Sequence, residues 1–296
     1  MGAPFRSGIV AVIGGANVGK STLVNALVGR KVAAVSDKPQ TTRLRALGIK
    51  HDPRGQLILM DTPGITEPRI LLEEKLVHQA FGAIREADVV LFLLDATKPI
   101  GPWEDAIFRR LPGLNSPVVL AVNKLDLVTP ERLDRIRAEA CGRFPFRHVH
   151  EISALRGDGL GALEGTLWDL LPEGPPYFPP GMTSSLPLPL QIGEIIREKV
   201  MCNTREEIPH AVAVSEVELI EEESRLRVNA TLIVEHNSQK GILIGKGGSM
   251  LNLIGREARE DIENLVGRHV FLELWVKVKE KWRRREDFLK TLGFSD

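Results

Sequence analysis

The sequence of 296 residues has few cysteines, no long hydrophobic run and no excess of charge of either sign. Its two cysteines, Cys141 and Cys202, lie apart from each other and from any His-Cys cluster, so neither a disulfide framework nor a zinc site is expected. The longest aliphatic or aromatic run, Val89 to Leu94, is far shorter than the roughly 18 residues that a membrane-spanning helix needs. With 43% hydrophobic and 26% charged residues, the chain is expected to be a soluble globular protein of a reducing cytosol. Its length suggests about two domains.

The start of the chain, Met1 to Gly8, has no basic segment followed by an apolar one, and Arg6 stands where a myristoylation signal has Ser or Thr. We therefore expect a protein that is neither secreted nor lipidated. The 39 basic and 39 acidic residues give a net charge of zero, but the two kinds are unevenly distributed along the chain. Residues 182–235 hold 5 Lys/Arg against 10 Asp/Glu, residues 236–296 hold 12 against 9, and Lys277 to Arg285 alone hold six basic residues and one acid. A local basic patch is therefore expected although the net charge of the chain is zero.

A proline-rich stretch divides the chain. Between Leu171 and Pro189 there are seven prolines in nineteen residues, which excludes a helix interior or a central strand. Loops of this length are uncommon inside compact domains, so we interpret the stretch as a semi-rigid linker, with a long surface loop as the alternative. The predicted organisation is a first domain at residues 1–172, a linker at 173–189 and a second domain at 190–296.

The first domain alternates short apolar runs with segments of helical length. The apolar runs are residues 8–14, 56–61, 88–95, 116–123 and 148–153. Runs this continuously apolar indicate strands that are buried on both faces, and the spacers between them fit βαβ crossovers. The pattern predicts a doubly wound α/β domain with a mostly parallel sheet, whose sites form beyond the carboxyl ends of the strands.

Directly after the first strand, residues 14–21 read GGANVGKS, which matches the phosphate-loop pattern G-x-x-x-x-G-K-[ST] and precedes a helix-competent run. In this pattern the backbone N–H groups surround phosphates, Lys20 reaches the terminal phosphates and the Ser21 hydroxyl ligates Mg²⁺. The nucleotide-binding residues predicted here are Gly14, Gly15, Ala16, Asn17, Val18, Gly19, Lys20, Ser21 and Thr22.

The base is indicated by a second motif, Asn123-Lys124-Leu125-Asp126, at the end of an apolar strand. The Asp126 carboxylate can accept from the ring N–H and the exocyclic amine of guanine, a donor pair that adenine lacks. Asn123 can support the base edge, and the stem of Lys124 can cover the base. After the next strand, Ser153, Ala154 and Leu155 are expected to close over the base, with an ordinary turn as the alternative.

The third strand ends in a further motif, Asp61-Thr62-Pro63-Gly64 followed by Ile65, which we include among the GTP-binding residues. An Asp at this strand end can hold Mg²⁺ through water, and the N–H of Gly64 can meet a γ-phosphate. The polar stretch Ser36 to Arg43 has no periodicity. It is interpreted as a mobile loop whose threonine completes the Mg²⁺ shell when a γ-phosphate is present, with a plain solvent loop as the alternative.

These four motifs resemble those of the translation-factor-related GTPases, and Gln-Thr-Thr-Arg at 40–43 with Asp-Thr-Pro-Gly at 61–64 is similar to the Era and Der branch. The resemblance implies GTP and GDP as ligands, with Mg²⁺ bound by Ser21, Thr42 and, through water, Asp61. Thr41 is the second choice for the threonine ligand. Ras-like GTPases have a water-orienting Gln where this chain has Ile65, so we expect slow hydrolysis alone. The resemblance also makes K⁺ a candidate cofactor at Asn17. The residues expected to act in catalysis are Lys20, Thr42 and Gly64.

The second domain is predicted to run helix, strand, strand, helix, GxxG loop, helix, strand. The helices are expected at residues 191–201, 238–244 and up to about 266, and the strands at 211–220, 225–235 and 269–278. The loop is Gly245-Lys246-Gly247-Gly248. This order resembles a type II KH domain, an α+β fold in which the GxxG loop holds the backbone of a few single-stranded nucleotides. The predicted RNA-binding residues are Gly245, Lys246, Gly247, Gly248, Lys277 and Lys279. The domain is expected to end in a basic C-terminal helix, and the basic stretch Lys277 to Arg285 is expected to contact RNA or a membrane surface, with a solvated helix face as the alternative.

The whole arrangement resembles the Era family, the KH-domain ribosome-assembly GTPases of bacteria, over essentially the full chain. The resemblance implies binding of the 3′ end of 16S rRNA and a role in maturation of the 30S subunit. It also implies a cytoplasmic protein, and family members are reported as peripheral proteins at the inner face of the cell membrane. We expect a monomer. The alternatives are an RNA-binding assembly scaffold with little GTP turnover and a GTPase of tRNA modification, which the GxxG domain disfavours.

Overall fold

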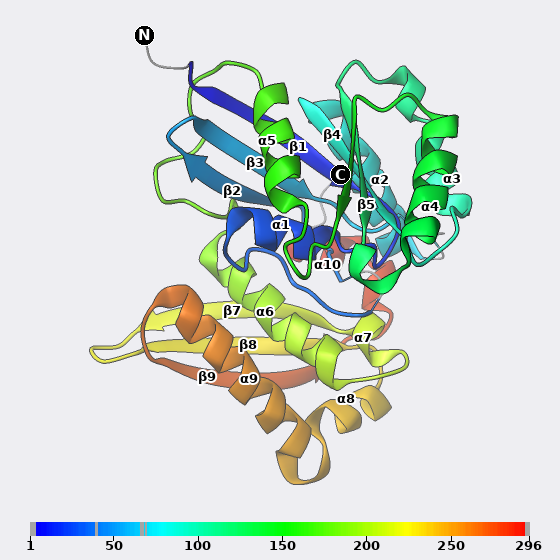
Figure 1. Cartoon of the computed structure of the whole chain (residues 1–296). Coiled ribbons are helices and arrows are strands. Elements are labelled where there is room, and N and C mark those ends of the chain that lie inside the picture. Colours follow the sequence, from blue (N-terminus) through cyan, green and yellow to red (C-terminus); the bar gives the residue numbers. More distant parts are fainter. Residues whose placement is uncertain (1–3, 39–40, 66–67, 69, 294–296) are drawn as a thin grey trace. The chain divides into compact units, whose positions relative to one another are not determined.

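The computed structural model describes residues 4–38, 41–65, 68 and 70–293, and they form two compact units (Figure 1). Unit 1 comprises residues 1–33, 42–68 and 76–185, and unit 2 comprises residues 34–41, 69–75 and 186–296. Unit 2 therefore takes two short segments from the predicted first domain. Gln40, part of the motif that resembles the Era and Der branch, lies outside the described residues.

Unit 1 contains a six-stranded sheet in which every neighbouring pair is parallel except β2 and β3. Its strands, in spatial order, are β2 (Ala46–Asp52), β3 (Gly55–Asp61), β1 (Arg6–Ile13), β4 (Val89–Asp95), β5 (Val118–Asn123) and β6 (His148–Ile152). All five strands predicted from the apolar runs are present. The predicted Ras-like, doubly wound α/β fold is confirmed.

The helices of unit 1 cover both faces of this sheet because side chains alternate between two apolar cores (Figure 1). Val10 and Val12 of β1 enter the core formed with α1 and α5, whereas Ala11 and Ile13 enter the core formed with α2, α3 and α4. The helices are α1 (Lys20–Val28), α2 (Leu71–Glu86), α3 (Pro102–Phe108), α4 (Pro130–Arg143) and α5 (Leu160–Leu170).

Strand β2 is not predicted from the sequence. It forms a hairpin with β3 and is the edge strand of the sheet, with Ala46 paired to Asp61 and Asp52 paired to Gly55. Its residues, ALGIKHD, alternate poorly between apolar and polar side chains. The hairpin partner therefore determines this strand more than its own pattern does.

Most of the proline-rich stretch predicted as a linker at 173–189 packs along β2 and is part of unit 1. The Ile49 N–H donates to the Thr183 carbonyl at 2.9 Å, and the Ser185 N–H donates to the Leu47 carbonyl at 3.0 Å. The buried Gln56 side chain binds the same stretch, accepting from Tyr177 N at 2.7 Å. The boundary between the units falls after Ser185, and the next helix begins at Leu188. The stretch thus covers an open sheet edge.

Unit 2 has the element order predicted for a type II KH domain, and that part of the fold class is also confirmed. Its elements are α6 (Leu188–Asn203), α7 (Ile208–Ala211), β7 (Ala213–Glu221), β8 (Leu226–Val234), α8 (Asn237–Ile244), α9 (Ser249–Val266), β9 (Val270–Val278) and α10 (Glu286–Thr291). Strand β8 lies between β7, which is antiparallel to it, and β9, which is parallel. Helices α6 and α9 pack on one face of this sheet through a single apolar core (Figure 1).

The prediction of a basic C-terminal helix is wrong. The final helix α10 begins with the acidic residues Glu286 and Asp287. In the basic stretch, Lys277 lies on β9, as the strand predicted at 269–278 requires, and Trp282–Arg284 form one 3₁₀ turn. The Trp282 side chain is fully buried, and its indole N–H donates to the Ala211 carbonyl at 2.8 Å. Burial of this large side chain holds the turn after β9 against the rest of unit 2.

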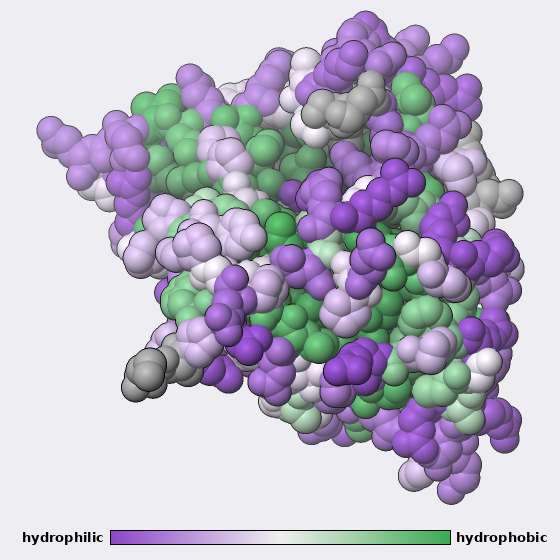
Figure 2. Space-filling model, turned by 90° about the horizontal axis from the view of Figure 1, so that it is seen from above, coloured by the Kyte–Doolittle hydropathy of each residue, from purple (hydrophilic) through white to green (hydrophobic). Residues whose placement is uncertain are grey.

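The face shown in Figure 2 has hydrophilic residues around most of its edge and hydrophobic residues gathered in several areas further in. Among the residues that the structure describes, no helix has both the length and the apolar character needed to cross a membrane.

Candidate functional site

The four nucleotide motifs of unit 1 meet at the carboxyl edge of the parallel strands, in the loops after β1, β3, β5 and β6. The phosphate loop begins after Ile13 and runs into α1 at Lys20. Gly19 has a φ of 100°, and a Cβ there would lie 2.4 Å from Nδ2 of Asn123. A glycine is therefore needed where the phosphate loop passes the base-binding motif.

The Lys20 side chain lies buried under the phosphate loop. Its ammonium group donates to the carbonyls of Gly15, at 2.8 Å, and Gly14, at 3.3 Å. Burial lowers the pKa of Lys20 from 10.5 to about 8, while the negative charges of Asp61 and Glu104 oppose this shift. The ammonium group thus lies among acceptors that point into the loop, and an added phosphate there would favour its charged form.

Three side-chain oxygens converge beside Lys20, from α1, the segment before β2, and the end of β3. The Ser21 hydroxyl donates to Oδ2 of Asp61 at 2.7 Å, and the Thr42 hydroxyl donates to the same oxygen at 3.0 Å. The two hydroxyl oxygens are 2.8 Å apart. Two hydroxyls and one carboxylate are hard oxygen donors of the kind that Mg²⁺ prefers when phosphates complete its shell, so these residues fit the ion.

The structure distinguishes between the two threonines proposed as Mg²⁺ ligands. Thr42 lies in the oxygen cluster, whereas the Thr41 hydroxyl donates to the Lys38 carbonyl at 2.7 Å and lies 2.7 Å from the Ser36 hydroxyl. Elsewhere in the described part of the chain, His, Cys, Asp and Glu side chains form no group of three or more that could hold a metal ion.

The motif at the end of β3 contacts the phosphate loop directly. A Cβ on Gly64 would lie 2.8 Å from the Cα of Ala16, and the Ile65 N–H donates to the Gly14 carbonyl at 3.3 Å. The Thr62 hydroxyl donates to the Val12 carbonyl at 2.7 Å. The Ile65 side chain is 2% exposed and packs in a core cluster of unit 1. This position therefore has no polar group to orient a water.

The Asn123 side chain links two loops through hydrogen bonds. Its amide nitrogen donates to the Val18 carbonyl at 2.8 Å, and its amide oxygen accepts from the Ala154 N–H at 2.9 Å. The sequence interpretation placed this side chain at the base edge; the structure shows it joining the phosphate loop to residues 153–155. Ser153 and Ala154 are buried, whereas the Leu155 side chain is exposed. The Asp126 carboxylate lies 3.7 Å from Nε of Arg156.

One residue of this region was missed from the sequence. Asp95, the last residue of β4, binds Nζ of Lys124 at 2.7 Å, and the same Nζ donates to the Asn17 carbonyl at 2.8 Å. Burial alone would raise the pKa of the Asp95 carboxyl, but hydrogen bonds from Lys124 and Thr97 outweigh it and lower the pKa. An Asp that ends a fully apolar strand at the sheet's carboxyl edge is the signal that could have identified it.

The GxxG loop of unit 2 joins α8 to α9. Gly245, Gly247 and Gly248 have φ values of 71°, 60° and 84°, which favour glycine, and Lys246 is exposed. A groove of about 430 Å³ lies between α9 and β9. Its lining includes Leu251, Asn252, Gly255, Arg256, Arg259, Val270, Phe271, Leu272 and Leu274. These groove residues could not be placed from the sequence.

The two lysines predicted to bind RNA from β9 and the turn after it make contacts within unit 2. The ammonium group of Lys277 binds Glu216 at 2.8 Å and remains largely exposed. The ammonium group of Lys279 lies 3.6 Å from the centre of the Phe288 ring. Of the basic run, Arg283 pairs with Glu235 and Arg285 pairs with Asp287. Much of the predicted basic patch is therefore neutralised by neighbouring groups.

A phosphate loop, a guanine-type base motif and a KH fold with a GxxG loop define a P-loop GTP-binding protein with an RNA-binding type of domain. Residues 9–124 match the family described as 50S ribosome-binding GTPase, and residues 207–283 match the KH domain family. The chain is 43% identical over 294 residues to the GTPase Era of Carboxydothermus hydrogenoformans, covering 99% of both chains. It is 44% identical over 293 residues to the GTPase Era of Alkaliphilus oremlandii, covering 98% of this chain and 99% of that one. The chain belongs to the Era family of GTPases.

Two solved structures are similar over nearly the whole chain. One is Era in complex with MgGDPNP and nucleotides 1506–1542 of 16S ribosomal RNA, with 41% identity, a TM-score of 0.93 and coverage of 99% of this chain and 100% of that one. The other is a variant of Aquifex aeolicus Era bound to GDP and AlF₄⁻, with 40% identity, a TM-score of 0.93 and the same coverage.

Proposed function

We propose that this chain is a Mg²⁺-dependent GTPase whose nucleotide state controls binding of its KH domain to the 3′ end of 16S rRNA, in maturation of the 30S ribosomal subunit. The observation that carries the nucleotide half is the convergence of the Ser21, Thr42 and Asp61 oxygens within 3.0 Å beside the phosphate loop. The RNA half is supported by the related Era that was solved with MgGDPNP and nucleotides of 16S ribosomal RNA.

In this proposal the phosphates lie among the backbone N–H groups of residues 14–21, at the start of α1. Lys20 turns its ammonium group from the Gly15 carbonyl toward the terminal phosphates. Ser21 and Thr42 would hold Mg²⁺ directly and Asp61 would hold it through water, and the ion would supply positive charge to the phosphates. Asp126 selects guanine through the ring N–H and the exocyclic amine.

Hydrolysis is proposed to be slow in the protein alone. Ile65 is buried against the core and carries no group that could orient the attacking water. Asn17, in the phosphate loop, has a φ of 61° and a carbonyl that faces the Lys124 ammonium. We propose that K⁺ binds at Asn17 and raises the hydrolysis rate, as the family resemblance implies.

RNA is proposed to bind along the GxxG loop and the groove between α9 and β9. Loop N–H groups and Lys246 face backbone phosphates, and Arg256 and Arg259 add positive charge along the groove. The apolar side chains of the groove lining, among them Leu251, Leu272 and Leu274, offer apolar surface to unstacked bases. Single-stranded RNA is therefore the expected form of the ligand.

The test is single-turnover GTP hydrolysis by the full chain with Mg²⁺, in K⁺ or Na⁺ buffer, with and without an RNA matching the 3′ end of 16S rRNA. Turnover that is lost in Lys20→Ala and raised by K⁺ or RNA supports the proposal. Turnover no higher than that of Lys20→Ala under every condition contradicts it and supports the assembly-scaffold alternative, which the buried Ile65 favours. Preferred capture of tRNA over 16S rRNA would support the tRNA-modification alternative.

We also propose a cytoplasmic location, with a fraction held peripherally at the inner face of the cell membrane. Cell fractionation tests this proposal. Protein that is recovered with membranes and released by high salt supports peripheral binding, because such binding is electrostatic. Recovery only in the cytosolic fraction at low salt contradicts it.

A further inference from the structure

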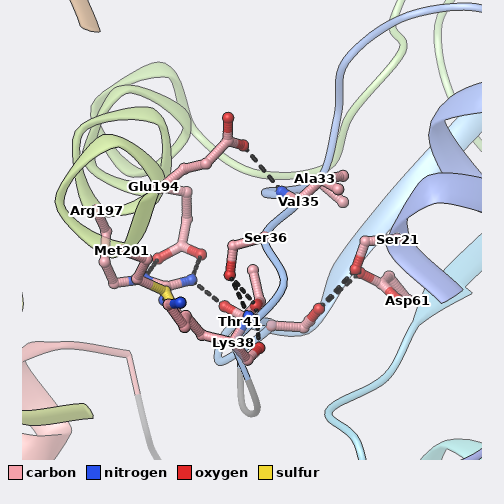
Figure 3. A network of polar contacts seen from close by, with 12 residues as sticks. Ser21, Ala33, Val35, Ser36, Lys38, Thr41, Asp61, Glu194, Arg197 and Met201 are labelled. Atoms are coloured by element: carbon pink, nitrogen blue, oxygen red, sulfur yellow. Dashed lines mark hydrogen bonds and ion pairs between the residues drawn. The ribbon is translucent and has the colours of Figure 1, made fainter. Parts of the chain in front are cut away.

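Two neighbouring side chains of α6 hold both ends of the segment at residues 34–41, which belongs to unit 2 (Figure 3). The Val35 N–H donates to the Glu198 carboxylate at 2.9 Å, and the Arg197 guanidinium donates to the Thr41 carbonyl. Arg197 is 2% exposed and Glu198 is 5% exposed, so both charged groups are buried. Charged side chains are rarely buried unless they are paired with other polar groups, so these contacts hold the two side chains in place.

The Arg197 guanidinium has a fixed orientation. Its Nε donates to Oε1 of Glu194 at 2.8 Å, its Nη2 also binds Glu194, and its Nη1 lies 2.9 Å from Sδ of Met201. These groups all belong to α6, and the Thr41 carbonyl is the contact that reaches another segment. A planar guanidinium held by a carboxylate in this way is a rigid donor, and a lysine at the same position would not reproduce its geometry.

The segment between the two contacts is itself closed by hydrogen bonds. The Lys38 N–H donates to the Ser36 hydroxyl at 3.1 Å, and the Thr41 hydroxyl donates to the Lys38 carbonyl at 2.7 Å. These bonds link Ser36, Lys38 and Thr41 to one another. The next residue in the chain is Thr42, whose hydroxyl belongs to the oxygen cluster with Ser21 and Asp61.

The following turns of α6 are joined to α9. Nζ of Lys199 binds Asp261 at 2.6 Å, and Nδ2 of Asn203 donates to Glu257 at 2.7 Å. Helix α9 starts directly after the GxxG loop and lines the groove with Arg256 and other side chains. One helix, α6, thus contacts both the segment that precedes Thr42 and the helix that forms the groove.

We propose that Arg197 and Glu198 are positioning residues that set the place of Thr42 and, through α6 and α9, couple the bound nucleotide to the affinity of the groove for RNA. This inference rests on the proposed function. A change in the place of Thr42 that accompanies a γ-phosphate displaces the Thr41 carbonyl next to it in the chain, which shifts Arg197 and the α6 helix that carries it. Since such coupling is reciprocal, RNA in the groove also favours the placement of Thr42 that suits GTP.

The test measures the affinity of the full chain for a labelled RNA matching the 3′ end of 16S rRNA, once with GDP and once with GDPNP, both with Mg²⁺. The ratio of the two dissociation constants is the coupling factor, which is about 5 to 150 in typical coupled systems. Arg197→Lys keeps a positive charge beside Glu194 but loses the planar guanidinium and its fixed set of N–H donors. The ratio is therefore expected to fall to within about twofold of one. Arg283→Lys is the matched control, because Arg283 forms a comparable pair with Glu235 in unit 2.

A second readout separates positioning from general stability. In Arg197→Lys, the Mg²⁺ concentration needed for half-maximal GDPNP binding is expected to rise at least about fivefold while GDP affinity stays within about twofold, because Thr42 contributes to the metal only with a γ-phosphate. A purely structural role would weaken both nucleotides alike. Glu198→Gln, which removes the charge that faces the Val35 N–H, is expected to move both readouts in the same direction as Arg197→Lys.

The outcomes are distinguishable. The inference is overturned if Arg197→Lys has the same coupling ratio as the wild type, or if Arg283→Lys loses as much coupling as Arg197→Lys. Either result leaves the proposed function unaffected. Wild-type protein that binds RNA equally with GDP and GDPNP also overturns it. Wild-type protein that fails to hydrolyse GTP and to bind the RNA overturns the proposed function as well.

Discussion

Raising the pH from 7 to 9 is expected to weaken GDP binding about tenfold, because Lys20 loses its proton in the nucleotide-free protein. Burial lowers the pKa of Lys20 to about 8. Phosphates beside the ammonium group favour its charged form, so the bound protein keeps the proton across this range. Binding above pH 8 therefore requires uptake of a proton.

The magnitude follows from linkage between protonation and binding. With a pKa of about 8, the dissociation constant for GDP is about 1.1 times its value for fully protonated Lys20 at pH 7, and about 11 times that value at pH 9. Their ratio is about tenfold, or roughly 1.4 kcal/mol. The free energy of unfolding without nucleotide changes in the opposite direction, because the pKa of Lys20 is lower in the folded chain than the unfolded value of 10.5. The cost of burying charged Lys20 is full below pH 8. It is relieved between about pH 8 and 10.5, so stability rises over that range.

The assay is isothermal titration calorimetry with GDP at several pH values from 6.5 to 9, in buffers of different ionisation enthalpy to count the protons taken up. Lys20→Arg is the control, because its guanidinium stays charged throughout and any titration of guanine itself affects both proteins equally. The wild type should show a tenfold loss that the variant lacks. Equal pH dependence in the two proteins, or no proton uptake at pH 9, refutes the reasoning.

Three further predictions concern the base site, the RNA surface and the core of unit 2. Asp126→Asn should weaken GTP binding at least about 100-fold and favour XTP, which carries a carbonyl in place of the guanine amine. Competition with labelled GDP measures both affinities, and unchanged GTP binding would exclude Asp126 as the residue that selects guanine. The double change Lys246→Asp and Gly247→Asp should weaken RNA binding at least about tenfold in anisotropy while GTP hydrolysis without RNA persists; retained RNA affinity would place the ligand elsewhere. Trp282→Ala should lower the free energy of unfolding by about 3 to 5 kcal/mol in urea, against less than about 1 kcal/mol for the exposed Trp275→Ala, and similar losses would contradict the burial argument.

The nucleotide motifs were predictable because each is a continuous string with a local mechanism. The run from Gly14 to Ser21 specifies a strand-to-helix turn through its glycines, and the apolar strands on either side specify their own burial. The order of elements in unit 2, including the GxxG loop, followed from the same periodicity arguments and was found in the structure.

Other features could not be predicted because they depend on contacts between distant parts of the chain. Asp95 acquires its role only when β4 and β5 pair and bring it opposite Asn123, beside Lys124. The sequence predicts a basic helix at the C-terminus, whereas the stretch at 277–285 lies partly on β9 and partly in a 3₁₀ turn whose Trp282 is buried, a contact that the sequence alone does not reveal. Strand β2 and the proline-rich stretch that covers it are ordered mainly by each other and by β3.

The sequence by itself determined the chemistry of this protein: a phosphate loop, a guanine motif and an RNA-binding type of loop, since each depends on residues that are neighbours in the chain. Only the tertiary structure decided which threonine joins Ser21 and Asp61, and that Val35 and Thr41 contact α6 of unit 2. The physical reason is that side-chain identity sets which bonds a residue can make. Folding decides which partners lie within about 3 Å to make them.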